Sequence, residues 1–92
     1  MQESTPPAEP DFDSLRLHLA KLRHERGWTY DELAARAAIG RATLVSMESG
    51  KPRRTPGKPA SRGNLETWYK IAVAFEIDLG DLLRPLYGSD PK

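Results

Sequence analysis

One short stretch, RATLVSMES, combines hydrogen-bonding and apolar side chains at helical spacing. Arg41, Thr43 and Ser46 are expected on one side of this helix, and Leu44 and Met47 on the other. A guanidinium donates several hydrogen bonds in a fixed plane, and a hydroxyl both donates and accepts. The stretch therefore predicts a helix with one side packed on a core and a polar side offered to a hydrogen-bonding partner.

A basic segment follows this helix directly. Residues 41–62 contain the single acid Glu48 and six bases, although the net charge of the chain is only +1. The bases are Arg41, Lys51, Arg53, Arg54, Lys58 and Arg62. Residues 1–13, by contrast, contain four acids and no base. Because a clustered charge acts locally, we expect a polyanionic partner that is contacted by one face.

The sequence offers little for catalysis or for metal binding. It has no cysteine, which excludes thiolate chemistry and cysteine zinc sites. His18 and His24 are six residues apart and project to nearly opposite sides of one helix. We also find no glycine-rich phosphate loop and no nucleophile–base pair. We therefore expect no enzyme activity, no metal, no cofactor and no small-molecule ligand.

The composition is that of a single small globular domain of 92 residues. No apolar run approaches the length of about eighteen residues that a bilayer requires. The N-terminus lacks the basic start and apolar stretch of a signal peptide. We expect a cytoplasmic protein without a membrane partner.

Apolar spacing and capping residues predict an all-α fold of five short helices. The first three are expected at residues 14–26, 30–37 and 41–49, the fourth after Asn64, and a short fifth between Asp78 and Pro85. Residues 1–12 are expected to form a disordered acidic tail, residues 13–86 the domain, with a basic, proline-rich loop at 51–63, and residues 87–92 a flexible C-terminus.

The second and third helices are separated by only a short turn. Thr29 and Glu32 have the spacing of a capping box, which predicts where the second helix begins. Ala34 is small enough for the two helices to approach closely. This arrangement predicts a helix-turn-helix, whose second helix is narrow enough for the major groove of DNA. Small residues at helix crossings also occur for packing alone, so the spacing alone leaves both interpretations open.

A longer stretch carries a family resemblance. The segment LRHERGWTYDELAARAAIGRATLVSMESGK resembles the Cro/C1-type (XRE, phage repressor-like) helix-turn-helix family, and NLETWYKIAVAFEIDLGDLL is similar to its two closing helices. Together they cover residues 15–83. The matching residue types are Gly27, Thr29, Leu33, Ala34, Ile39, Leu44, Glu48, Gly50, Leu65, Ile71, Ala72 and Leu82. The resemblance implies a five-helix, lambda-repressor-like DNA-binding domain with the helix-turn-helix at the second and third helices.

The resemblance also implies roles for individual residues. It assigns Arg41, Ala42 and Ser46 to base edges in the major groove. Arginine can donate two hydrogen bonds to guanine, a methyl can pack on thymine, and a hydroxyl serves either base. Contacts to the DNA backbone are expected from Thr29, Tyr30, Thr43, Ser49, Lys51, Arg53, Arg54 and Lys58. The alternatives are a solvated helix face and a basic spacer that only improves solubility.

The resemblance further implies a structural ion pair between Arg23 and Glu48. The sequence departs from the family at three positions: Tyr30 replaces a glutamine, Ala38 replaces the turn glycine, and Val45 replaces a polar residue. These departures put the operator sequence beyond prediction.

The sequence thus predicts a sequence-specific regulator of transcription that binds double-stranded DNA, a repressor acting as a homodimer on a palindromic operator. Activation in place of repression is left open. The dimer contact is expected through Leu83, Leu86 and Tyr87. The alternative is an antitoxin or adaptor-type protein-interaction module with the same fold, for which the acidic N-terminus and the apolar C-terminus could serve.

Overall fold

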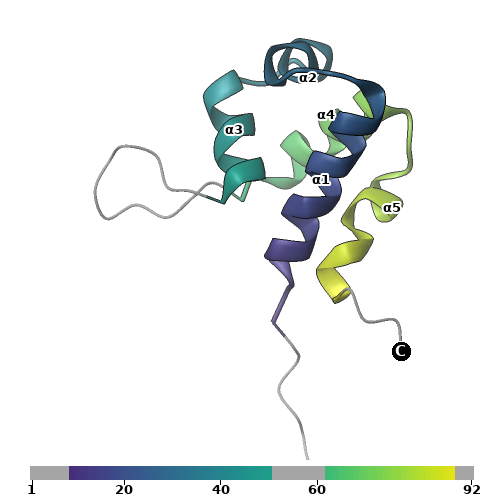
Figure 1. Cartoon of the computed structure of the whole chain (residues 1–92). Helices are drawn as coiled ribbons and strands as arrows, with labels where there is room; N and C mark the ends of the chain where they lie inside the picture. Colours follow the sequence, from purple (N-terminus) through teal and green to yellow (C-terminus); the bar gives the residue numbers. More distant parts are fainter. Residues whose placement is uncertain (1–8, 51–61, 89–92) are drawn as a thin grey trace, which may run out of the picture.

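The computed structural model describes residues 9–50 and 62–88, and these parts of the chain contain helices and no strand (Figure 1). The elements in order are α1 (Phe12–Arg26), α2 (Tyr30–Ala37), α3 (Arg41–Ser49), α4 (Leu65–Phe75), α5 (Leu79–Leu83) and the 3₁₀ helix η1 (Arg84–Tyr87). The predicted all-α fold of five helices is confirmed, and η1 follows it. No helix in the described ranges has both the length and the hydrophobicity that crossing a bilayer requires.

One apolar core holds the helices together. α1 contributes Leu15 and Leu19, four residues apart, and α4 contributes Trp68, Ile71 and Phe75 at intervals of three and four. Figure 1 shows α1 running between α3 and α5, with α2 at the top of the view, seen nearly end-on. α2 also packs on α4. Each helix therefore buries a single stripe, which leaves its opposite side for solvent or a partner.

α1 begins at Phe12, two residues before the expected start. The Asp11 carboxylate accepts hydrogen bonds from the Ser14 backbone N–H (3.0 Å) and from Ser14 Oγ (2.8 Å). These bonds hold the pKa of Asp11 below its ordinary value. The Asp11 N–H also donates to the Leu86 carbonyl at 2.9 Å. The prediction that the tail extends through residue 12 is therefore wrong at its last two residues. Asp11 caps α1, and Phe12 is the first residue of this helix and packs on the core.

The other predicted boundaries are only partly within the described residues. Tyr87 belongs to η1, so ordered helix continues one residue beyond the expected end of the domain. Residues 1–8, 51–61 and 89–92 lie outside the described residues. The last part of the basic loop is described. Trp68 Nε1 donates to the Arg62 carbonyl at 2.8 Å, and the Arg62 guanidinium lies 4.2 Å from the centre of the Phe12 ring.

α2 ends on a residue with left-handed backbone geometry. Ala38 has φ +57 and ψ +46, and its N–H closes the helix onto the Ala35 carbonyl at 3.2 Å. In this region the Cβ of an L-residue comes too close to a backbone carbonyl oxygen, whereas glycine has no Cβ and is not strained. The chain therefore keeps a small strain at the turn between α2 and α3.

We predict that Ala38→Gly raises the free energy of unfolding by about 0.5–1 kcal/mol, since glycine removes this strain. The matched control is Ala35→Gly, an exposed position within α2, which should lower it by about 1 kcal/mol. Urea unfolding followed by far-UV circular dichroism measures both. If both variants lost the same free energy of unfolding, Ala38 would not be strained in the wild type.

Candidate nucleic-acid interface

The first turn of α2 is fixed by a capping box. Thr29 Oγ1 accepts from the Glu32 N–H (3.1 Å), and Glu32 Oε1 accepts from the Thr29 N–H (2.8 Å). Three residues then separate the end of α2 from the start of α3. In this turn the Ile39 N–H donates to the Ala34 carbonyl at 3.0 Å. Local hydrogen bonds thus set both the start of α2 and the turn into α3.

The outer side of α3 is defined by Arg41, Ala42, Val45 and Ser49. At 3.6 residues per turn these four positions share one side of the helix. They are exposed, or half-buried in the case of Val45, whereas Leu44 and Met47 on the opposite side are completely buried. Figure 1 shows α3 at the edge of the molecule. The outer side of α3 is therefore available to a large partner.

The structure contradicts the prediction for Ser46. This side chain is turned toward the protein and the residue is only 4% exposed, so it cannot reach a base edge from the position seen here. Val45, which the sequence marked only as an apolar departure, lies on the outer side instead. Its spacing of four residues from Arg41 is the signal that would have identified it.

A buried ion pair fixes the inner side of α3. Arg23 Nε donates to Glu48 Oε2 at 2.9 Å, and Arg23 Nη2 donates to Glu48 Oε1 at 2.7 Å. Both residues are at most 9% exposed. The hydrogen bond to Glu48 raises the pKa of the Arg23 guanidinium above its already high ordinary value, so the arginine stays charged. The pair expected from the sequence is present and joins α1 to α3.

Arg41 meets α2 as well as solvent. Its Nε lies 2.9 Å from Asp31 Oδ1, and its side chain remains 60% exposed. The Arg41 guanidinium is also 5.7 Å from the centre of the Tyr30 ring. The residue predicted to read a base is therefore solvent-accessible and held from one side.

The residues expected to contact the DNA backbone lie in three places. Thr29 and Tyr30 are at the start of α2, exposed and half-buried respectively. Thr43 is half-buried on α3, and Ser49 is exposed at its end. Four further residues lie outside the described parts of the chain: Lys51, Arg53, Arg54 and Lys58.

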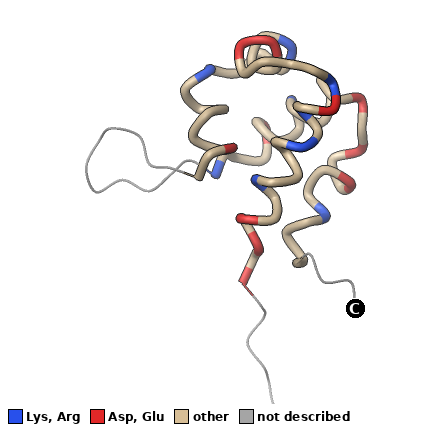
Figure 2. Tube along the Cα trace, viewed as in Figure 1, with Lys and Arg blue, Asp and Glu red and all other residues tan. Residues whose placement is uncertain are grey.

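The electrostatics of α3 favour an anionic partner at one end. Arg41 and Glu48 are its only charged residues, and Glu48 is neutralised by Arg23. Figure 2 shows most of α3 without charge.

Within residues 9–50 and 62–88, no three histidine, aspartate or glutamate side chains are grouped so as to hold a metal ion.

Two helices joined by a three-residue turn, the second of which keeps one side open to solvent, define a helix-turn-helix protein. The chain belongs to the family of the Cro/C1-type HTH DNA-binding domain, whose model matches residues 18–85. This result confirms the resemblance that the sequence indicated. No curated protein matches the chain in sequence.

Solved structures share the fold. The restriction-modification controller protein C.AhdI from Aeromonas hydrophila is 22% identical, with 78% of this chain and 96% of that chain covered and a TM-score of 0.61. The clp gene regulator ClgR from C. glutamicum is 22% identical, with 90% and 97% covered and a TM-score of 0.62. SinR, a Bacillus subtilis protein, was solved in complex with DNA and is 22% identical, with 75% and 97% covered and a TM-score of 0.56.

We predict that Glu48→Gln lowers the free energy of unfolding by about 3 kcal/mol or more, because it leaves a buried arginine without its charge partner. The matched control is Glu66→Gln, which breaks the exposed pair with Lys70 and should cost at most about 1 kcal/mol. Urea titration measures both. Similar losses in the two variants would show that burial adds nothing to the Arg23–Glu48 pair.

Proposed function

We propose that this protein is a sequence-specific regulator of transcription that binds double-stranded DNA with α3 in the major groove. The observation that carries the proposal is the outer side of α3, which is open to solvent while its inner side is fixed by Leu44, Met47 and Glu48. Membership in a DNA-binding family supports it. The similar proteins C.AhdI, SinR and ClgR are described as a controller protein, a master regulator and a gene regulator, which supports a regulatory role.

Arg41 and Ala42 are the proposed base readers. A guanidinium can donate two hydrogen bonds to O6 and N7 of guanine, and the Ala42 methyl can contact a thymine methyl. Val45, which shares this side, offers further methyl groups. We assign the hydroxyls of Thr29, Tyr30, Thr43 and Ser49 to phosphates, where they would orient the domain without reading sequence. Lys51, Arg53, Arg54 and Lys58 would add contacts that depend on salt.

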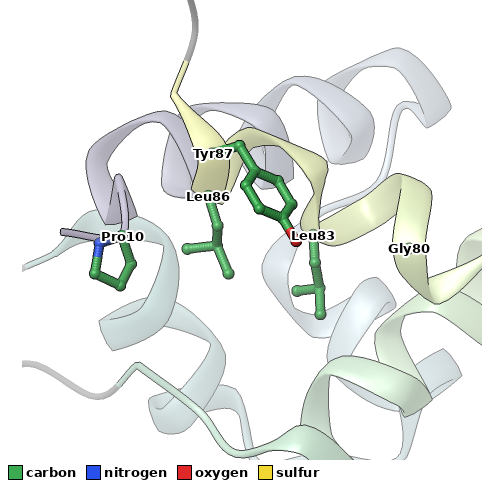
Figure 3. Close-up of a pocket in the computed structure, with 5 residues that line it drawn as sticks. All are labelled: Pro10, Gly80, Leu83, Leu86 and Tyr87. Carbon is green, nitrogen blue, oxygen red and sulfur yellow. The ribbon is translucent and has the colours of Figure 1, made fainter. Parts of the chain in front are cut away.

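The proposed operator is a palindrome bound by two copies of the chain. One recognition helix reads few base pairs, and paired helices reach half-sites about 34 Å apart on one side of the duplex. Leu83, Leu86 and Tyr87 line an apolar hollow of about 440 Å³ together with Pro10 and Gly80 (Figure 3). Tyr87 is 93% exposed. An exposed ring beside an apolar hollow suits a two-fold contact, in which each copy supplies both parts.

Repression is the mode that we favour. A protein that occupies an operator blocks other proteins by its presence alone, whereas activation requires a further contact with the transcription machinery.

One observation favours the alternative of an adaptor or antitoxin-type module. Leu65, Tyr69 and Val73 follow each other at intervals of four along α4, and each is more than half exposed. Such a stripe suits a protein partner. The two functions differ in salt dependence. Three phosphate contacts should weaken duplex binding about fortyfold between about 50 and about 200 mM salt, whereas an adaptor should show no such binding.

We predict that Arg41→Ala relaxes base preference at one position in each half-site by about 1–3 kcal/mol, since the paired hydrogen bonds to guanine are lost. Selection of bound sequences from a randomised duplex pool, followed by fluorescence anisotropy, measures the change. Lys21→Ala removes the same charge from an exposed position of α1 and should leave the selected sequence unchanged. If Arg41→Ala selected the same sequence as the wild type, Arg41 would not be a base-reading residue.

We also predict that Tyr87→Ala raises the dissociation constant of the dimer at least about tenfold, because a buried aromatic at an interface carries much of its energy. Sedimentation equilibrium measures this constant. The matched control is Tyr69→Ala, which removes an exposed tyrosine from α4 and should leave the dissociation constant unchanged. The reverse result would move the interface to α4.

A further inference from the structure

An exposed ion pair joins the recognition helix to the first turn of α2. Arg41 Nε lies 2.9 Å from Asp31 Oδ1, and the two side chains are 60% and 76% exposed. A pair this open to water stabilises a fold very little, because solvent screens it and both side chains lose freedom. Its consequence is the direction in which it holds the guanidinium of Arg41.

The Tyr30 ring lies near the same guanidinium. Its ring centre is 5.7 Å from Arg41 Cζ and 4.3 Å from Arg23 Cζ. Arg23 is fixed by its buried pair with Glu48. The ring therefore contacts both a buried guanidinium and an exposed one, and guanidinium groups are attracted to aromatic faces. The capping box at Thr29 and Glu32 fixes the helix turn that carries both Tyr30 and Asp31.

The restraint on Arg41 affects DNA recognition, because an unrestrained arginine adopts many rotamers and can donate to many different acceptors on DNA. Ordering it during binding costs conformational entropy. A carboxylate on Nε leaves the terminal nitrogens Nη1 and Nη2 to form the planar fork that guanine accepts. The negative charge of Asp31 also disfavours a phosphate nearby, and a contact from Arg41 to phosphate would carry no sequence information.

We propose that Asp31 and Tyr30 are positioning residues for Arg41, and that an α2 carboxylate which touches no base sets the base preference at the position that Arg41 reads. The inference rests on the proposed function. Asp31 acts through the orientation of Arg41, and the Tyr30 ring limits the other orientations.

The test measures base preference separately from affinity. Duplexes that carry the selected operator and its three substitutions at the Arg41 position are titrated by fluorescence anisotropy. Asp31→Asn should lower the preference for the selected base about tenfold, with preferences at other positions unchanged within about twofold. Affinity for random duplex should stay equal or rise, because a negative charge is lost. Tyr30→Phe keeps the ring and should keep the base preference, while its affinity should fall equally for all duplexes because the hydroxyl assigned to phosphate is lost. Tyr30→Ala should reduce the base preference itself.

Glu66→Gln is the matched control, since it breaks another exposed ion pair and should change no base preference. Nitrogen-15 NMR of the DNA-free protein tests the pair itself. The Arg41 Nε–H signal should be resolved in the wild type and merge with those of other exposed arginines in Asp31→Asn.

The outcomes separate the inference from the function on which it rests. A preference within twofold of wild type in Asp31→Asn, or an equal loss for all sequences, overturns the inference and leaves the regulator intact. An unresolved Arg41 signal in the wild type also overturns it. A wild-type protein that selects no duplex sequence overturns the proposed function and the inference together.

Discussion

The pair between Arg23 and Glu48 is the interaction on which the rest of the structure depends. Apolar contacts of Leu44 and Met47 bury α3, but such contacts have little directionality and tolerate rotation of a helix about its axis. Two charge-assisted hydrogen bonds do not tolerate it, because both carboxylate oxygens must meet the guanidinium in its plane. The pair therefore determines which residues of α3 face outward. A buried ion pair adds little net stability to a fold. The Arg23–Glu48 pair is therefore better explained by its effect on the orientation of α3.

The same arginine connects three segments. Besides Glu48 on α3, Arg23 donates from Nη1 to the Trp28 carbonyl at 2.8 Å, just before α2 begins. Its guanidinium also faces the Tyr30 ring in the first turn of α2. A short series of contacts thus runs from the core to the exposed guanidinium of Arg41. In the proposed function, base reading would depend on how rigidly these few groups are held.

Much of the fold could be predicted because its determinants are local. α2 and α3 begin and end where the sequence indicates, since a capping box and terminal turns fix them within a few residues. The start of α1 was missed because prolines near the N-terminus suggested a tail and concealed the cap at Asp11. The burial of Ser46 could not be predicted from nine residues, because the rotation of α3 is set by Arg23 on another helix. The contact between Asp31 and Arg41 joins two helices and likewise needed the structure.

The composition of the outer side of α3 constrains how a half-site would be read. Arg41 is the single residue there with paired hydrogen-bond donors, because Ala42 and Val45 are apolar and Ser49 has one hydroxyl. Methyl groups distinguish thymine mainly through its own methyl, which is a weaker discrimination than two hydrogen bonds to guanine. Specificity would then be concentrated at one base pair in each half-site. In the proposed dimer, a second copy at a fixed spacing would supply the remaining selectivity, since two such positions and the distance between them must all match.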